Sequence, residues 1–362
     1  LASVLFICNT ILFFRLYNSR FTVNYSNNNY FTMLKHSVKL SFKNFQKYKV
    51  YNIGNLFGLT IGIAISLMIF QHVSREFSYE KSFPKHERIF RVSTHNEWAK
   101  SSPPFAEELK SYFPEIENIV RLAKNGGNIA VINYNQQTTT SKNVFLADQS
   151  IVDVFDLKVI QGLPDSALTR PFTVLITESI SDNLFGDENP VGKQIEIDER
   201  KEKYEVTGVI KGLPENSHIK ADILVSMPTF YKDRPVEWTS SRGWMVMYTY
   251  VLIDKHENID SFYSKMPDFM KYFIPSEMVE GMLADGIFFE ILPITSIHLY
   301  SSKIQEMGVN SDIMYIYIFS VLAAIILLIV CVNFINMFTT LVFKRIKEVG
   351  LRKIVGASRF QI

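Results

Sequence analysis

Two long apolar runs dominate the pattern of hydrophobic and polar positions along the chain. Residues 53–70 and residues 315–332 each contain 18 consecutive residues without a charge, close to the roughly 20 that an α-helix needs to cross the hydrocarbon core of a bilayer. We therefore predict one transmembrane helix at residues 51–73 and a second at residues 313–342. A buried helix of a soluble protein is the alternative, and the basic residues beside each run argue against it.

Charged residues are unevenly distributed around these runs. Residues 1–70 contain no Asp or Glu and residues 313–362 contain one, whereas the middle, residues 71–312, holds 35 acids against 25 bases. Because Lys and Arg concentrate on the cytoplasmic side of membrane spans, we predict that both basic ends lie inside the cell and residues 74–312 lie outside the cytoplasm. The basic clusters occur only beside the predicted spans. We therefore expect membrane lipids as partners of these clusters and do not expect nucleic acid.

The segment before the first run has two parts. Residues 1–32 do not begin with methionine, and their apolar stretch is too short to span and lacks the features of a signal peptide. We predict that they are an upstream extension and that Met33 is the biological start. Residues 33–50 carry lysines at every fourth position: Lys35, Lys39, Lys43 and Lys47. This spacing predicts a basic amphipathic helix in the membrane interface, with a solvated surface helix as the alternative.

Four small residues recur at every fourth position of the first run: Gly54, Gly58, Gly62 and Ser66. On a helix this spacing places them in one stripe, and in lipid such a stripe lets the backbone of another helix approach closely. We predict that the stripe is a helix-packing face. The alternative is that glycine is simply frequent in membrane helices.

The middle of the chain alternates between strand-like and helix-like patterns, which predicts an α+β domain at residues 74–312. The polar residues 135–141 separate two strand-like segments, residues 128–134 and 142–146, so we predict a hairpin with residues 135–141 as its loop. Residues 228–243 are predicted to be irregular. The longer predicted helices lie at residues 103–113, 178–185 and 259–273. The predicted fold is a membrane protein in which two transmembrane α-helices bracket an α+β extracytoplasmic domain.

Candidate catalytic chemistry is weak throughout the sequence. Residues 186–193 (GDENPVGK) differ from a phosphate-binding loop in glycine spacing and in the residue after the lysine. His86 and Glu87 lack the second histidine of a zinc-binding helix. Both cysteines, Cys8 and Cys331, lie in apolar runs, which leaves no cysteine for a disulfide or a Cys-based metal site in residues 71–312. We therefore expect no catalytic, cofactor or metal site and no enzymatic activity in this chain.

Seven ordered segments resemble the N-terminal half of bacterial FtsX-like ABC transporter permeases with a MacB-like periplasmic core domain. These segments are residues 39–44 (KLSFKN), 77–92 (FSYEKSFPKHERIFRV), 113–122 (FPEIENIVRL), 175–192 (LITESISDNLFGDENPVG), 206–222 (VTGVIKGLPENSHIKAD), 297–301 (IHLYS) and 332–361 (VNFINMFTTLVFKRIKEVGLRKIVGASRFQ). The family has further spans beyond this point, so the resemblance implies that the chain is a fragment of a longer multi-pass protein of the bacterial inner membrane.

The resemblance also implies a mechanism and a set of partners. A separate cytoplasmic ABC ATPase subunit hydrolyses ATP, and the permease, as a homo- or heterodimer, transmits its motion to the periplasmic domain to export or extrude a substrate. A periplasmic adaptor or an outer-membrane protein is a further expected partner. Residues 343–362 then begin the cytoplasmic coupling segment, with these candidate ATPase-coupling residues: Lys344, Arg345, Lys347, Glu348, Gly350, Arg352 and Lys353. An ion pair between Glu348 and Arg352 within the helix is the alternative for that cluster.

A second class of function fits the same two-span layout. A signalling protein places an extracytoplasmic sensor domain between two spans, and its inner helix leads to a catalytic domain. The sequence after residue 362 distinguishes the two classes, because a permease continues into further apolar spans.

Overall fold

The computed structural model describes residues 49–356, except residues 126, 128, 199–202 and 258. The predicted extension at residues 1–32 and nearly all of the predicted interfacial helix at residues 33–50 lie outside the described residues. The chain divides into two compact units, one of residues 1–67 with 324–362 and the other, the domain, of residues 68–323. Each unit is described by itself.

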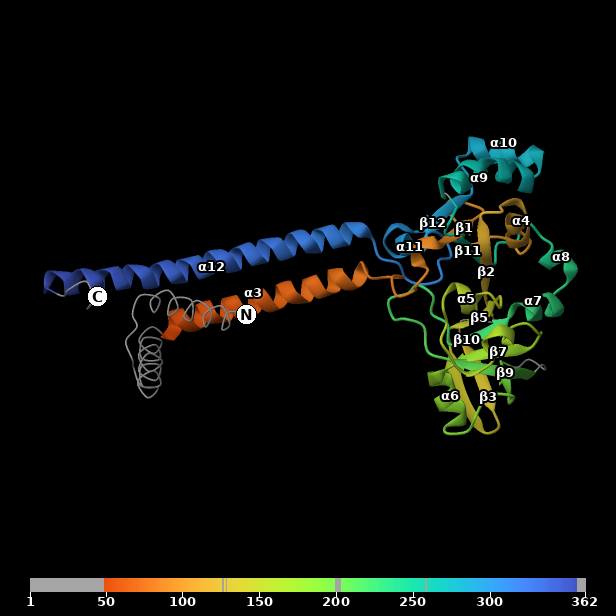
Figure 1. The fold of residues 1–362 in the computed structure, drawn as a ribbon, viewed down its shortest axis with the longest axis horizontal. Helices are drawn as coiled ribbons and strands as arrows, with labels where there is room; N and C mark the ends of the chain where they lie inside the picture. Colours follow the sequence, from red (N-terminus) through yellow and green to blue (C-terminus); the bar gives the residue numbers. More distant parts are fainter. Residues whose placement is uncertain (1–48, 126, 128, 199–202, 258, 357–362) are drawn as a thin grey trace. The chain divides into compact units, whose positions relative to one another are not determined.

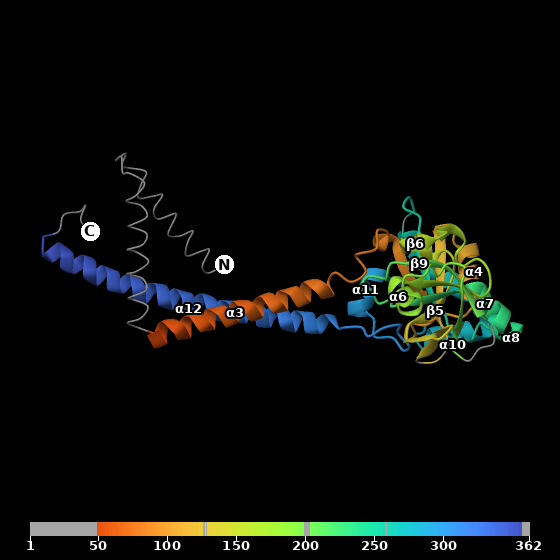
Figure 2. The same ribbon diagram turned by 90° about the horizontal axis from the view of Figure 1, so that it is seen from below.

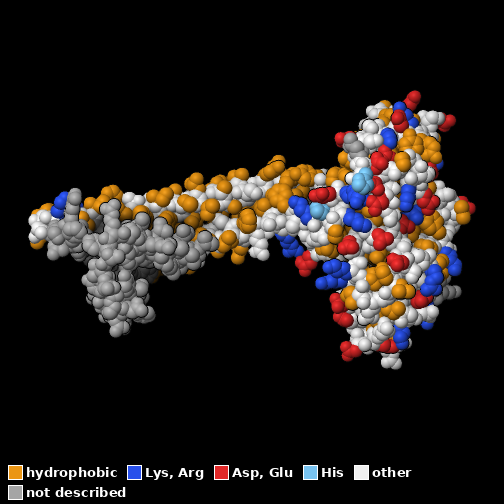
Figure 3. Space-filling view, viewed as in Figure 1, with side chains coloured by type: hydrophobic (Ala, Val, Ile, Leu, Met, Phe, Trp, Pro, Cys, Tyr) orange, Lys and Arg blue, Asp and Glu red, His pale blue; other side chains and the backbone are white. Residues whose placement is uncertain are grey.

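Two long apolar helices, α3 (Lys49–Glu76) and α12 (Ile313–Ile354), are each continuous (Figures 1 and 2). Within them, Ile53–Glu76 and Ile313–Thr339 are long and apolar enough to cross a bilayer. Their apolar side chains point outward, as with Phe70 at 70% exposure and Leu328 at 63%, and Figure 3 shows hydrophobic side chains along these helices. A helix that is apolar on its outer surface requires lipid or another apolar partner.

The domain is built on one mixed sheet of twelve described strands, with charged side chains over its surface (Figure 3). Its order is β12-β1-β11-β2-β5-β10-β7-β9-β8-β3-β4, and β6 pairs with β9. The pairs β5–β10 and β7–β9 are parallel and the others antiparallel. The strands are β1 (Ile89–Ser93), β2 (Ile116–Lys124), β3 (Ala130–Tyr134), β4 (Gln137–Ser141), β5 (Val144–Ala147), β6 (Val159–Gly162), β7 (Thr173–Thr177), β8 (Gln194–Ile197), β9 (Lys203–Ile210), β10 (Ile223–Ser226), β11 (Tyr248–Ile253) and β12 (Glu290–Pro293).

Short helices cover the sheet, and Figure 1 shows α9 and α10 at one end of the domain and α6 at the other. The helices are α4 (Phe105–Tyr112), α5 (Ile151–Val154), α6 (Glu178–Phe185), α7 (Met227–Asp233), α8 (Val236–Thr239), α9 (Ile259–Phe273), α10 (Ser276–Ala284) and α11 (Ile294–Tyr300), with 3-10 turns at His86–Arg88 and Pro164–Ser166. This α+β architecture between two long apolar helices confirms the predicted fold class.

Helix α9 shows how an amphipathic pattern becomes a packed element. Its apolar residues recur three and four positions apart, and Phe262, Phe269 and Phe273 are completely buried. Phe269 lies edge-on to Phe105 of α4 at a centroid distance of 5.8 Å, and Phe113 lies 4.7 Å from Phe262. Edge-to-face aromatic pairs add about 0.5–1.5 kcal/mol beyond the burial of area, so these rings fix α9 and α4 on the sheet.

Two predicted elements are wrong. The predicted hairpin loop at residues 135–141 contains the strand β4, which pairs with β3 from Ala130↔Ser141 to Tyr134↔Gln137. The segment that was expected to close the hairpin is β5, which pairs instead with β2 and β10. The segment predicted to be irregular, residues 228–243, contains most of α7 and all of α8.

Candidate functional site

Three segments far apart in the sequence meet in the domain where α3 ends. They are residues 75–82, residues 215–218 and residues 298–306, and we call them, together with Arg91 and Tyr250, the polar junction. Three of the segments that carry the resemblance, residues 77–92, 206–222 and 297–301, contribute to it. Six of its polar or charged side chains are buried, and such groups are costly unless they are paired: Glu80, Arg91, Ser217, His218, His298 and Ser301.

Glu80 is the centre of the first part of the junction. Its side chain is completely buried, and its carboxylate accepts hydrogen bonds from the Ser217 hydroxyl at 2.9 Å and from the His218 backbone amide at 2.5 Å. Its backbone has φ of 63°, a left-handed conformation that costs a residue with a Cβ about 1–2 kcal/mol. The amide of Glu80 also donates to the carbonyl of Asn216 at 2.8 Å. These bonds hold the chain leaving α3 against residues 216–218.

A hydrogen-bonded chain continues from Glu80 into the sheet. His218 Nδ1 lies 2.8 Å from Glu80 Oε1, and His218 Nε2 lies 2.6 Å from the hydroxyl of Tyr250 on β11. A neutral imidazole that donates from Nδ1 and accepts at Nε2 satisfies both contacts. Burial raises the pKa of Tyr250 well above its usual value, so its phenol stays protonated and can donate.

A carboxylate, an imidazole and a phenol in a row also occur in catalytic relays. Here Glu80 and Tyr250 are completely buried and His218 is 4% exposed. A substrate therefore cannot reach these three side chains. No group of three or more His, Cys, Asp or Glu side chains that could hold a metal occurs among the described residues. The arrangement therefore acts as a buried connection between the α3 exit and the sheet.

The second part of the junction joins α3 to α11. Glu76, the last residue of α3, lies 2.8 Å from His298 Nε2 of α11, and the Tyr79 ring stacks on the His298 imidazole with centroids 3.4 Å apart. The Glu76 and His298 side chains are 12% and 5% exposed. Burial, followed by the Glu76 charge, raises the pKa of Tyr79, which keeps the stacked ring neutral. We call the contact of Glu76, Tyr79 and His298 the clasp.

The third part of the junction fixes the chain between α11 and α12. Arg91 of β1 is 1% exposed and forms a bidentate pair with Glu306, with Nη1–Oε2 and Nη2–Oε1 distances of 2.5 and 2.9 Å. The Ser301 hydroxyl accepts from Arg91 Nη2 at 2.7 Å and also bonds to Glu306. Such a planar fork on a carboxylate is a strong and directional contact. It ties the central sheet to the segment that leads into α12.

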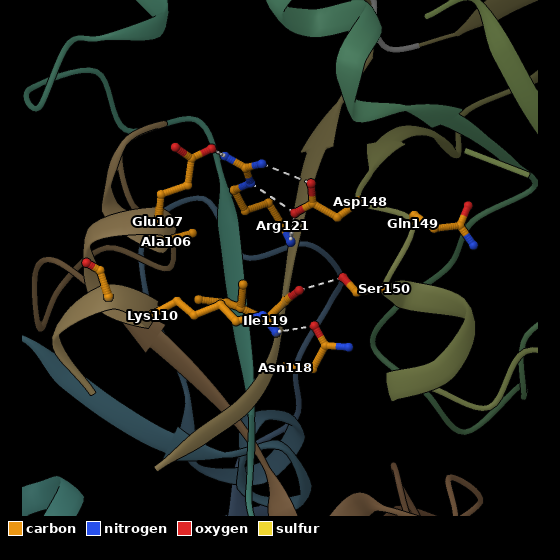
Figure 4. Close-up of a pocket in the computed structure, with 10 residues that line it drawn as sticks. Ala106, Glu107, Lys110, Asn118, Ile119, Arg121, Asp148, Gln149 and Ser150 are labelled. Atoms are coloured by element: carbon orange, nitrogen blue, oxygen red, sulfur yellow. Dashed lines mark hydrogen bonds and ion pairs between the residues drawn. The ribbon is translucent and has the colours of Figure 1, made fainter. Parts of the chain in front are cut away.

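A separate hollow of about 520 Å³ lies between α4, β2 and the start of α5 (Figure 4). Arg121 of β2 binds Asp148 through Nε at 2.9 Å and Nη2 at 3.0 Å, while its Nη1 donates to the Tyr231 hydroxyl at 2.6 Å. Burial alone lowers the pKa of Arg121, but the hydrogen bonds and charge of Asp148 outweigh it and hold that pKa above its usual value. The Ser150 hydroxyl donates to the Ile119 carbonyl at 2.5 Å. The main cation of this hollow is thus already paired within the protein.

The predicted small-residue stripe lies on α3, and its members differ in their surroundings. A methyl group at Gly62 would lie 2.2 Å from Cγ2 of Val330 on α12, and one at Gly58 would lie 3.5 Å from Nδ2 of Asn333. At Gly54 a methyl group would have no described atom within 4 Å. The Ser66 hydroxyl is buried without a hydrogen-bond partner in the described part of the chain. The role of the stripe stays a prediction.

The predicted coupling residues lie on the last part of α12, beyond the candidate span. Lys347, Gly350 and Lys353 are exposed. The side chains of the other four are outside what the structure describes: Lys344, Arg345, Glu348 and Arg352. Their contact with an ATPase stays a prediction.

Sequence reasoning did not identify the residues of the junction. The available signal is a charged residue inside a strand-like apolar segment, as with Arg91 in IFRVS, where all five residues are buried. Glu80, His218 and His298 carry no spacing pattern, because their contacts join positions 138 and 222 residues apart.

The fold and the junction define a class: a membrane protein with an extracytoplasmic α+β domain between two spans. The profile of the MacB-like periplasmic core domain matches residues 53–268, and the chain belongs to that family. It carries the periplasmic domain of a MacB/FtsX-like ABC transporter permease, a family whose ATPase activity lies in a separate subunit or domain. The chain has no match among curated proteins.

Several solved structures are similar to this chain. A domain from Porphyromonas gingivalis, named as part of a permease, is 28% identical with a TM-score of 0.49, covering 58% of this chain and 92% of its own. The periplasmic region of MacB from Actinobacillus actinomycetemcomitans is 17% identical with a TM-score of 0.42. The match covers 58% of this chain and 90% of the MacB region. The extracellular domain of the noncanonic ABC-type transporter YknZ from Gram-positive bacteria is 15% identical with a TM-score of 0.38. The match covers 56% of this chain and 99% of the YknZ domain. With TM-scores below 0.5, these likenesses add nothing to the family match.

Proposed function

We propose that the chain is part of a permease subunit of an FtsX/MacB-type ABC transporter in the bacterial inner membrane. In this proposal a separate cytoplasmic subunit hydrolyses ATP, and the two spans carry its motion to the extracytoplasmic domain, which acts on a substrate for export or extrusion. The chain itself performs no chemistry on the substrate, and its task is mechanical transmission.

The observation that carries this proposal is the connection of the segment just before α12 to the junction. The Ser311 amide donates to the His298 carbonyl at 2.8 Å, and the Asp312 carboxylate accepts from the Met314 amide at 2.8 Å. The second bond satisfies a free amide at the helix start and stabilises it by about 1 kcal/mol. The same His298 holds Glu76 of α3 through its side chain. One residue therefore contacts both the end of α3 and the segment that starts α12.

The helix α12 then supplies a route towards the cytoplasm. Its 42 residues form one helix, which at 1.5 Å per residue is about 63 Å long. A continuous helix is stiff because each backbone amide is bonded one turn away. A displacement of the basic segment at its end is thus passed along the helix instead of being lost in a loop.

Docking of an ATPase on that basic segment can be tested in the full-length permease co-expressed with its ATPase subunit. The double change Glu348→Lys with Gly350→Leu reverses the one acid and adds bulk at a glycine that has no described atom within 4 Å of its Cβ position. We expect reduced co-purification of the ATPase and a lower hydrolysis rate.

The matched control is Glu280→Lys with Gly281→Leu on the exposed surface of α10, which makes the same chemical changes in the extracytoplasmic domain. This control should purify with its ATPase as the parent does. Normal complex formation and a normal rate in the Glu348 and Gly350 variant would remove this segment as the docking site.

A further inference from the structure

A second hollow in the domain differs in charge from the one beside Arg121. It has a volume of about 520 Å³ and lies at the ends of the neighbouring strands β11, β2 and β5, beside the connection into α12. Its main lining residues are Lys124, Lys142, Phe145, Tyr248, Glu306 and Met307. We call it the basic groove. Its volume falls in the range of small-molecule sites, about 300–1,000 Å³.

The strand register explains why these side chains share one face. Lys124 of β2 lies opposite Phe145 of β5, and Tyr248 of β11 lies opposite Leu122 of β2. Side chains that lie opposite each other in paired strands project from the same face, as do those two positions apart along a strand. Lys124, Phe145 and Tyr248 are therefore placed together by the sheet itself.

The groove has an excess of positive charge. Lys124 and Lys142 line it, and the ammonium group of Lys100 lies 5.2 Å from the centre of the Tyr248 ring. None of these three lysines forms an ion pair with a carboxylate among the described residues. The one acid that lines the groove, Glu306, has both oxygens bound by Arg91. Burial, followed by the charge of Lys124, lowers the pKa of Lys100, which fits a site where cations lie close together.

Apolar side chains form the floor of the groove, and Asn143 also lines it. Phe145 and Tyr248 are each 4% exposed, Met307 is half-buried, and Ile129 at the rim is 54% exposed. The Tyr248 hydroxyl donates a hydrogen bond to the Gln305 carbonyl at 2.8 Å. A ligand that fits both surfaces has an anionic group for the lysines and an apolar part for the floor.

The chain also limits how far the groove lies from the membrane span. Met307 precedes Ile313, the first residue of α12 and of the candidate span, by six residues. An extended chain covers at most about 3.6 Å per residue, which places Met307 within about 22 Å of Ile313. The groove is thus within reach of the outer surface of the bilayer, where the accessible anionic amphiphiles are lipids with phosphate headgroups.

We propose that the basic groove binds the phosphate headgroup of an anionic lipid, with the first part of its acyl chains against Phe145 and Met307. The shared chemistry is a phosphate, which a free phosphate ion also carries, and the apolar floor favours the lipid. This site does not depend on the proposed coupling to an ATPase, because every residue in it belongs to the extracytoplasmic domain.

The test measures binding to the purified full chain in detergent. The probes are a short-chain phosphatidylglycerol, a short-chain phosphatidylcholine of equal tail length, and inorganic phosphate. We expect the anionic lipid to bind more tightly than either of the others, and its affinity to fall as salt is added because exposed lysine charges are screened.

The decisive variant is Lys124→Gln with Lys142→Gln. Both lysines are exposed, so their loss does not disturb the core. At about 1 kcal/mol per lysine near an anionic lipid surface, removing two lowers the affinity for phosphatidylglycerol about thirtyfold. The matched control, Lys110→Gln with Lys255→Gln, removes the same charge from exposed positions elsewhere and should leave the affinity unchanged.

Three results would overturn the proposal. Equal binding of phosphatidylcholine and phosphatidylglycerol would remove the headgroup phosphate charge as the determinant. Inorganic phosphate binding as tightly as the lipid would assign the groove to the free ion. An equal loss of affinity in the control variant would show that net charge, and not this groove, attracts the lipid.

Discussion

At the scale of single residues, the junction depends on charges that have been removed from water. Arg91 lies in a strand whose five residues are all buried, and its only described carboxylate partner is Glu306. Removing one partner of a buried ion pair leaves the other charge without compensation, which costs about 3–5 kcal/mol. An exposed pair such as Arg75 with Glu215 contributes about 0–1 kcal/mol.

The first prediction follows from this difference. Glu306→Gln should lower the free energy of unfolding of the domain by about 3–5 kcal/mol, measured by denaturant titration of the purified chain. Glu215→Gln, which removes the exposed partner of Arg75, should lower it by less than about 1 kcal/mol. Equal stability of the two variants would contradict the claim that loss of Glu306 leaves the buried charge of Arg91 without compensation.

A second residue-scale prediction concerns Glu115, whose side chain is 3% exposed. Burial alone raises the pKa of Glu115, but hydrogen bonds from Lys265 and Ser261 outweigh it and lower that pKa below its usual 4.5. A carboxyl with a lowered pKa stabilises the fold above its unfolded pKa, and the contribution is lost as the pH falls through its folded pKa.

Lys265→Met should therefore destabilise the domain at neutral pH, and the difference from the parent should shrink as the pH falls below about 4.5. Thermal unfolding at a series of pH values measures this. Lys271→Met, on the exposed surface of the same helix, should change stability little at any pH. A deficit in the Lys265 variant that is the same at every pH would contradict this role for Glu115.

The junction also shows where sequence reasoning ends at this scale. The apolar strands and the helix at residues 259–273 follow from periodicity, because one buried face repeats at a fixed spacing. Glu80, His218 and Tyr250 have no such repeat, since each contact depends on how distant segments fold together. A buried charge inside an apolar strand, such as Arg91, is the one local signal that was available.

At the scale of elements, α3 and α12 pack where a glycine meets a branched side chain. Valine is stiff at χ1 in a helix, so Val330 cannot easily move away from a methyl group placed 2.2 Å from its Cγ2. Overpacking of a close contact costs about 1–3 kcal/mol. We therefore expect substitution by a larger residue to be most destabilising at Gly62 and best tolerated at Gly54.

The third prediction is that Gly62→Val weakens the α3–α12 contact whereas Gly54→Val does not. Thermal stability of the detergent-solubilised chain measures the effect. Adding Val330→Ala to Gly62→Val should restore most of the loss, because it removes the group that the new side chain meets. Failure of that rescue, or equal effects of the two valine substitutions, would place the contact elsewhere.

The wrong hairpin prediction is also an element-scale lesson. Strand β4, with the sequence QTTTS, lies at the edge of the sheet, and most of its residues are exposed. A strand without a buried face has no alternating pattern to detect, and its β-branched threonines were the remaining signal. The apolar residues of β5 are all buried, and periodicity alone could not show that its partners are β2 and β10.

At the scale of the whole molecule, the chain that leaves α3 and the chain that enters α12 meet at buried contacts within the domain. The clasp connects the last residue of α3 with α11. The ion pair of Arg91 with Glu306 fixes the segment between α11 and α12. Two spans could be predicted from hydropathy because eighteen uncharged residues are rare outside membranes. Their common attachment could not, because it depends on side chains 222 residues apart.

We propose that the clasp, which joins the end of α3 to α11, transmits motion from the spans to the domain. The most direct measurement is energy transfer from a fluorophore at position Tyr272, an exposed residue of α9, to acceptor-labelled lipids. The sample is the full-length permease with its ATPase subunit in lipid nanodiscs, compared without nucleotide and with ATP trapped by vanadate.

We predict that trapping changes the transfer efficiency in the parent. In the double variant Glu76→Gln, His298→Ala, ATP hydrolysis should continue while the change in efficiency is lost. Arg75→Gln, which alters the exposed pair one residue away, should retain the change. The same change in the clasp variant as in the parent, or no change in a parent that hydrolyses ATP, would contradict transmission through the clasp.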